Sequence, residues 1–208
     1  MRAHIDHSTA IIKHAISLRD AGLAALAYFY FDVRDEEKQS PRTFLTSLLT
    51  QLSAFSEPCC EIISRLQSTH GKGAQRPSIG ILINCLKEML KVVAEQPVYI
   101  IIDALNECPD ISELPTPRAV LLEILKDLVD LHVPNLHICA TSRLEIDIKN
   151  VLEPLAYGIV SLHDESGQQK YISDYVSNVV YSDRNMRKWR EDQKALVIKN
   201  VTENADGM

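Results

Sequence analysis

The chain lacks a surplus of basic residues. Its 22 lysines and arginines are outnumbered by 28 aspartates and glutamates, which gives a formal net charge of -6. A protein that binds nucleic acid mainly through the phosphate backbone needs basic side chains to neutralise that backbone. The composition therefore argues against nucleic acid as a partner.

Long hydrophobic runs are absent as well. No uninterrupted apolar stretch approaches the ~18 residues that indicate a membrane-spanning helix, and the first residues lack the apolar core of a secretory signal peptide. We therefore expect no membrane partner and a cytoplasmic location.

Cysteine is present without a pattern. The five cysteines are odd in number, and no two of them have CxxC spacing. Disulfide frameworks and structural zinc sites use paired, regularly spaced cysteines, so we expect reduced thiols instead. These cysteines are Cys59, Cys60, Cys85, Cys108 and Cys139.

What the chain does contain is an alternation of helix and strand patterns. The segments with apolar residues at helical spacing are residues 8–19, 44–52, 61–68, 79–93, 119–131 and 171–179. A last, more polar helix is expected over about residues 183–203. The short apolar runs that predict strands are residues 26–31, 98–102 and 136–140, with a weaker run at 157–162. Ser40 followed by Pro41 is a helix-start signal.

This alternation predicts an α/β fold with a parallel sheet and helices on both faces. Ligands of such sheets bind at the carboxyl ends of the strands. Asp32, Asp103 and residues 141–143 follow three of the predicted strands. Polar side chains are therefore expected to converge on one edge of the sheet.

The segment VYIIIDALNEC has the form of a Walker B strand, in which an apolar strand delivers Asp103 to the sheet edge to hold a magnesium ion. Glu107 is then placed to orient or deprotonate the water that attacks a γ-phosphate. The alternative is that Asp103 and Glu107 are turn residues after a buried strand. The pattern alone leaves both interpretations open.

Four segments in order carry a resemblance to a known family. They are YFYFDVRDEEKQ, the Ser40-Pro41-Arg42 helix start, IIIDALNEC and LHICATSRLEIDI. Together they resemble the nephrocystin-3-like N-terminal domain of fungal NACHT-type STAND proteins, signalling P-loop NTPases that often carry ankyrin or other repeats. The resemblance runs from about residue 8 to residue 208.

The resemblance implies a three-layer P-loop NTPase-like parallel sheet over residues 1–162, incomplete, and the start of a small helical region over residues 163–208. It implies that Asp103 is the magnesium-binding and catalytic aspartate and Glu107 the second catalytic acid. Arg143 would be the cofactor-binding, sensor-type arginine that reads the γ-phosphate. Magnesium with ATP is the expected cofactor of the family.

The chain departs from the family in two places. Asn106 stands where the family commonly has a second aspartate, and no glycine precedes Gly22, so the GxxxxGK[ST] loop (Walker A) is missing with the strand that leads into it. We therefore expect truncation at both ends, weak or no ATP hydrolysis, and open sheet edges that favour self-association or association with related STAND proteins. The competing hypothesis is a non-catalytic interaction fragment that associates with intact relatives.

Overall fold

A three-stranded parallel sheet organises residues 2–156, which form one of the two units of the chain; residues 157–208 form the other. The computed structural model describes residues 3–70, 76–110, 114–159, 165–182 and 186–203. Strands β1 (Ala25–Tyr30), β2 (Val98–Asp103) and β3 (Leu136–Ala140) pair in that order. The prediction of an α/β chain with a parallel sheet is confirmed.

The register of the sheet brings its carboxyl ends to one edge. Tyr30 at the end of β1 lies beside Asp103 at the end of β2, and Ile102 lies beside Ala140 at the end of β3. The residues that follow the three strands are therefore neighbours, although long segments separate them in the sequence.

Helices surround this sheet. They are α1 (Ala3–Asp20), α2 (Pro41–Ser53), α3 (Glu57–His70), α4 (Ile79–Val92), α5 (Pro117–Asp130) and α6 (Ile146–Leu152). Short 3-10 helices occupy Glu36–Lys38, Leu105–Glu107 and Glu153–Leu155. The helix-start signal at Ser40 is confirmed, because the Ser40 side chain accepts a hydrogen bond from the Thr43 N–H.

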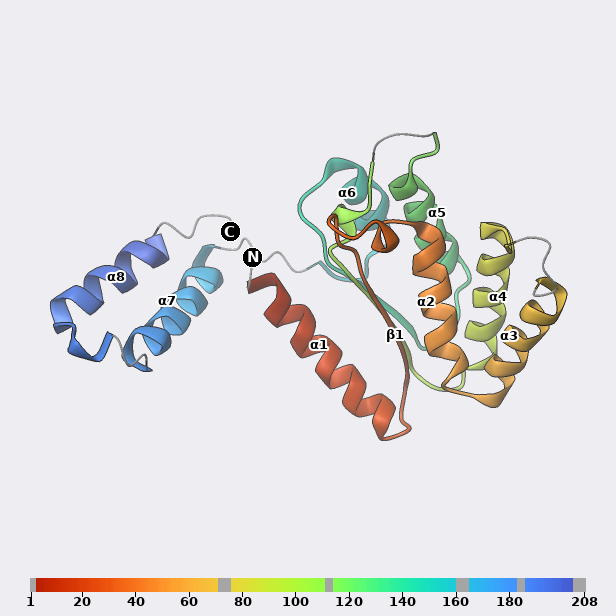
Figure 1. Ribbon diagram of the computed structural model, residues 1–208, viewed down its shortest axis with the longest axis horizontal. Coiled ribbons are helices and arrows are strands. Elements are labelled where there is room, and N and C mark those ends of the chain that lie inside the picture. Colours follow the sequence, from red (N-terminus) through yellow and green to blue (C-terminus); the bar gives the residue numbers. More distant parts are fainter. Residues whose placement is uncertain (1–2, 71–75, 111–113, 160–164, 183–185, 204–208) are drawn as a thin grey trace. The chain divides into compact units, whose positions relative to one another are not determined.

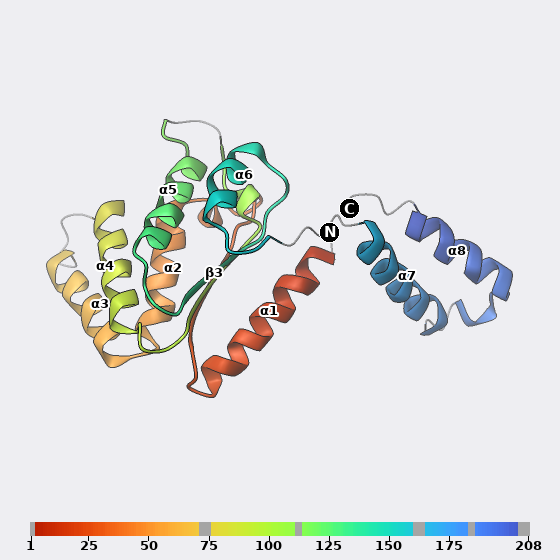
Figure 2. The ribbon, with the colours of Figure 1, turned by 180° about the vertical axis from the view of Figure 1, so that it is seen from behind.

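Helices pack on both faces of the sheet. On one face, the apolar side chains of α2, α4 and α5 form the larger core with the inward residues of β1 and β2. On the other face, Ile12 and Ala15 of α1 pack against Leu26 and Ile101. Figure 1 and the reverse view in Figure 2 both place α1 and α2 on opposite sides of β1.

The two edges of the sheet differ. At the outer edge of β1, the Gln51 amide of α2 accepts a hydrogen bond from the Tyr28 N–H at 3.0 Å and donates one to the Tyr28 carbonyl at 2.7 Å. Strand β1 is almost wholly buried, whereas every residue of β3 is half-buried or exposed. Gln51 therefore caps the middle of the β1 edge, and β3 is the more exposed edge strand.

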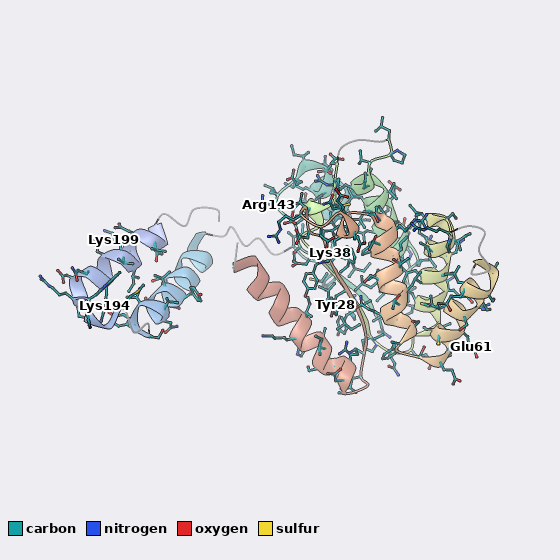
Figure 3. The ribbon with its side chains drawn as sticks, viewed as in Figure 1. Tyr28, Lys38, Glu61, Arg143, Lys194 and Lys199 are labelled. Atoms are coloured by element: carbon teal, nitrogen blue, oxygen red, sulfur yellow. The ribbon has the colours of Figure 1, made fainter. Side chains whose placement is uncertain are left out.

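The second unit contains two helices, α7 (Glu165–Ser182) and α8 (Glu191–Glu203), with a 3-10 turn at Met186–Lys188. Lys194 of α8 is buried against α7, where its ammonium pairs with Glu191 at 2.9 Å and lies 4.9 Å from the centre of the Tyr181 ring. Figure 3 labels Lys194 on this helix pair. None of the helices in the described ranges combines the length and the apolar character that crossing a membrane requires.

Several element predictions need correction. The first helix begins at Ala3 instead of residue 8, the helix expected from residue 61 begins at Glu57, and the last helix begins at Glu191 instead of about residue 183. The weak strand expected over residues 157–162 does not form at residues 157–159, and residues 160–162 lie outside the described ranges. Helix α6 was not predicted, because its seven residues bury only Ile148 and so carry no periodic pattern.

Candidate functional site

Asp103 lies at the carboxyl end of β2, where the next strand fixes its side chain. The Thr141 hydroxyl donates a hydrogen bond to the Asp103 carboxylate at 2.5 Å and accepts one from the Ala104 N–H at 3.0 Å. Ala104 has a left-handed backbone with φ 54°, which turns the chain into the 3-10 helix Leu105–Glu107. The Asp103 carboxylate is thus held in a defined orientation at the strand end.

Tyr30 and Cys139 lie near this carboxylate on the flanking strands. Burial raises the pKa of the Tyr30 phenol, and the negative charge of Asp103 raises it further. The pKa of the Cys139 thiol rises for the same two reasons, with burial again the larger cause. Both groups therefore stay protonated at neutral pH, and neither is a base or a nucleophile there.

Glu107 faces the loop that follows β1. Its carboxylate accepts a hydrogen bond from the Val33 N–H at 2.9 Å. In the same loop, the Arg34 guanidinium binds the Asp32 carboxylate at 2.9 and 3.0 Å, and these hydrogen bonds lower the pKa of Asp32 to about 2. The structure thus brings Glu107 to the β1 loop and ties Asp32 to Arg34.

Arg143 follows β3, and its backbone is bound to the turn after β2. The Arg143 N–H donates to the Asn106 side-chain oxygen at 2.9 Å. The Arg143 residue is exposed, and its guanidinium makes no hydrogen bond or ion pair within the described residues. Figure 3 labels Arg143 in the sheet unit. Among the residues that the structure describes, this positive charge has no partner, and it lies on the segment that follows β3, beside the end of β2.

Arg118 is a member of this group that the sequence analysis missed. Its guanidinium donates to the Cys108 carbonyl at 2.9 Å and the Asn106 carbonyl at 2.8 Å, and it pairs with Asp147 at 3.3 Å. The Arg118 side chain is only 11% exposed. Its sequence signal is weak, since an arginine directly after a helix-initial proline reads as an ordinary surface residue of a first turn.

The oxygen ligands at this edge are of the kind that magnesium prefers. Asp103 supplies a carboxylate, and the Thr141 hydroxyl lies beside it. Across the described ranges, no three residues of the types His, Cys, Asp and Glu gather as a metal-holding group. The site fits an ion that keeps most of its water and takes one protein carboxylate, as magnesium does.

Comparison with known proteins identifies the family of this chain. The model of the family described as nephrocystin 3, N-terminal, matches residues 7–143. No curated protein matches the chain. The matched range is more than half of the 208 residues and includes Asp103, Glu107 and Arg143. The chain therefore belongs to the nephrocystin 3 N-terminal family.

Proposed function

We propose that the sheet unit is a nucleotide-switch module of the NACHT and STAND class, with a three-layer P-loop NTPase-like fold. It binds magnesium with ATP weakly and hydrolyses ATP poorly or not at all. The observation that carries the proposal is the placement of two groups at neighbouring strand ends. They are the oriented carboxylate of Asp103 and the exposed guanidinium of Arg143. Asp103 is oriented by Thr141, and Arg143 is held through its backbone by Asn106.

Each residue has a separate part in this proposal. Asp103 would hold the magnesium ion, and the exposed Arg143 side chain would meet the terminal phosphate. Magnesium, when bound, supplies positive charge that neutralises the phosphate oxygens. The protein side chains contribute the orientation of that charge at the carboxyl end of a parallel sheet, where α/β proteins bind ligands.

The surroundings of Glu107 and Asn106 support binding over hydrolysis. One Glu107 carboxylate oxygen is already engaged by the Val33 N–H. The Asn106 side-chain oxygen is engaged by the Arg143 N–H, and it belongs to a neutral amide. Phosphoryl transfer requires a residue that positions the attacking water together with full charge stabilisation, so these engagements favour slow turnover.

Calorimetric titration of the protein with ATP or ADP in the presence of magnesium tests the proposal. We choose Asp103→Asn as the variant, because the amide keeps the shape of the side chain and loses its charge. Asp130→Asn, on the exposed end of α5, is the matched control with the same change of charge. We expect magnesium-dependent binding by the wild type and by Asp130→Asn, and its loss in Asp103→Asn.

Two results contradict the proposal. The first is the absence of nucleotide binding by folded wild-type protein. The second is equal nucleotide binding by Asp103→Asn and Asp130→Asn, which would show that Asp103 does not hold the metal. A steady-state phosphate-release assay on the same samples tests the slow-turnover part, and rapid hydrolysis would overturn that part alone.

The open edge of β3 supports a second candidate function, which is association. The parallel pairing directs alternate residues of β3 toward β2, as seen in the bonds of the Asn135 carbonyl and the Thr141 N–H to that strand. The backbone groups of Ile138 and Ala140 then face outward, whereas the Leu136 N–H donates to the Val133 carbonyl at 3.4 Å. Residues 136–140 contain no charged residue and no proline, which are the usual protections of an edge strand.

We propose that a second copy of this chain pairs with this edge. In a two-fold antiparallel pairing centred on Ile138, Leu136 lies opposite Ala140 of the second copy, so no like charges meet. Association with a related STAND protein through the same edge is the alternative form. At the β1 edge, by contrast, Gln51 already occupies the backbone groups of Tyr28 in the middle of the strand.

Sedimentation velocity over a concentration series tests this association. Ala140→Lys places a charge on the exposed end of β3, and Ala54→Lys at the exposed end of α2 is the control. We expect concentration-dependent dimers for the wild type and the control, and monomers for Ala140→Lys. A wild type that stays monomeric at every concentration contradicts self-association, and a complex formed only with a related chain would favour the alternative form.

A further inference from the structure

Arg118 joins three segments that the sequence keeps apart. It lies in the first turn of α5, and its guanidinium contacts the turn after β2 through the carbonyls of Asn106 and Cys108. The remaining nitrogen pairs with Asp147 in the first turn of α6, which follows β3. One largely buried side chain therefore bridges the ends of two strands.

Asn106 lies in the middle of this arrangement. Its carbonyl accepts from Arg118 at 2.8 Å, and its side-chain oxygen accepts from the Arg143 N–H at 2.9 Å. The orientation of the Asn106 side chain depends on where its backbone lies. The backbone that Arg118 holds is thus the same backbone that presents the acceptor for Arg143.

Arg143 lies in the loop between β3 and α6, and the Arg118 guanidinium also holds the far end of this loop through Asp147. Asp147 is four residues beyond Arg143, and the intervening residues include the exposed Leu144 and Ile146. Ile148, next to Asp147, is buried in the main core. The loop is therefore short, exposed in its middle, and anchored at both ends to groups that contact Arg118.

We infer that Arg118 is a positioning residue for Arg143, acting through Asn106 on one side of the loop and through Asp147 on the other. Its effect on the Arg143 backbone is independent of any ligand. Its effect on nucleotide affinity rests on the proposed function of Arg143. Arginine suits this place because its planar fork donates in several fixed directions, whereas lysine is a point charge on a flexible stem.

The direct test is the hydrogen exchange rate of the Arg143 amide in the full chain, measured by nuclear magnetic resonance. In Arg118→Lys, we expect this exchange to become about tenfold faster, which corresponds to losing one hydrogen bond of ordinary strength. Arg65→Lys, at an exposed arginine of α3, is the matched control, and we expect no change there.

Variants of Asn106 and Asp147 test the two contacts through which Arg118 would act on Arg143. Asn106→Asp keeps an oxygen acceptor for the Arg143 N–H, so protection should persist, whereas Asn106→Leu should remove it. Asp147→Asn loses only the ion pair with Arg118. Because the Asp147 side chain is partly exposed, we expect this variant to fold, and it serves as the test if Arg118→Lys fails to fold. We expect a smaller but measurable acceleration of exchange in Asp147→Asn.

Nucleotide titration distinguishes an effect of Arg118 on the position of Arg143 from a general loss of structure in the site. If Arg118 acts through Arg143, then Arg118→Lys weakens nucleotide binding in the wild-type background and has no further effect in an Arg143→Ala background. Equal weakening in both backgrounds would overturn the route through Arg143. If the wild type binds no nucleotide, the proposed function fails, while the exchange measurement still decides the positioning role.

Unchanged exchange of the Arg143 amide in both Arg118→Lys and Asp147→Asn overturns the inference. Faster exchange in these variants at every amide of the sheet unit overturns it too, since that would show a global loss of stability. The supporting result is acceleration confined to the loop between β3 and α6.

Discussion

Thr141 is the residue on which the strand-end contacts converge. Its hydroxyl binds Asp103 and the Ala104 N–H, its N–H binds the Ile102 carbonyl, and its carbonyl accepts from the Leu105 N–H. All of these partners belong to β2 and the turn after it. The Thr141 side chain thus helps to orient the candidate metal ligand Asp103.

Replacing this hydroxyl should be costly. In Thr141→Val, the Asp103 carboxylate loses a donor and the partly buried Ala104 N–H loses its acceptor, so we expect the free energy of unfolding to fall by about 1–3 kcal/mol. Urea denaturation measures this change. Thr141→Ser keeps the hydroxyl and is the control, and similar losses in the two variants would show that the methyl group matters instead.

The burial of the Cys108 thiol predicts that the folded protein loses stability at alkaline pH. Burial raises the pKa of Cys108 to about 12, well above that of an unfolded cysteine. Because the folded pKa is the higher one, its contribution to stability is complete below about pH 8.5 and is lost as pH rises toward about 12. We expect the melting temperature to fall over this range, and to fall less in Cys108→Ala.

Alkylation of the native protein gives an independent check of the same residue. Cys60 is exposed, whereas Cys108 is fully buried. We expect iodoacetamide at mildly alkaline pH to modify Cys60 and to leave Cys108 unmodified until the protein unfolds. Modification of Cys108 at the rate of Cys60 in native protein would contradict its burial.

At the scale of elements, the sheet is asymmetric. Gln51 of α2 caps the backbone groups of Tyr28 at the outer edge of β1, and β2 lies between the other two strands. The residues of β3 are half-buried or exposed, so the outward backbone groups of Ile138 and Ala140 depend on solvent or on a partner. Because Gln51 caps the middle of β1, the β3 edge is the one where we expect a further strand to add.

Removing the β1 cap should lower stability. In Gln51→Met, the length of the side chain is kept, but the Tyr28 N–H and carbonyl both lose their partner in a partly buried place. We expect a loss of about 1–3 kcal/mol in the free energy of unfolding, measured by urea denaturation. Gln67→Met, at an exposed position of α3, is the control that should change little.

At the scale of the whole molecule, the chain divides between Ala156 and Tyr157. The sheet unit has a large apolar core, whereas the second unit buries few side chains among the described residues, notably Val180 and Lys194. Local stability follows the amount of buried apolar surface. The sheet unit is therefore expected to resist unfolding better than the helix pair.

The division predicts the first site of limited proteolysis. Tyr157 is fully exposed and lies in a segment without helix or strand. We expect chymotrypsin to cut after Tyr157 before it cuts within the sheet unit, and mass spectrometry of the fragments identifies the cut. Tyr157→Ser should slow this first cleavage. Early cleavage inside β1 or β2 would contradict the predicted order.

Some of the candidate site could be predicted from the sequence, because strand ends of a parallel sheet share one edge. The position of Asp103 at the end of β2 and the place of Arg143 after β3 follow from that rule. The role of Asn106 could not be predicted. In the sequence, Asn106 differs from the aspartate expected there only by its missing charge, whereas in the structure its side-chain oxygen accepts a hydrogen bond from the Arg143 N–H.

Local sequence patterns are enough to place the three strands and most helices, because β-branched runs, apolar periodicity and signals such as Ser40-Pro41 act within a few residues. Tertiary structure alone decided the strand order, the Gln51 cap on Tyr28, the Thr141 bond to Asp103 and the Arg118 bridge. These contacts join residues that lie on different elements. They depend on where the core places each element, and no local pattern records that placement.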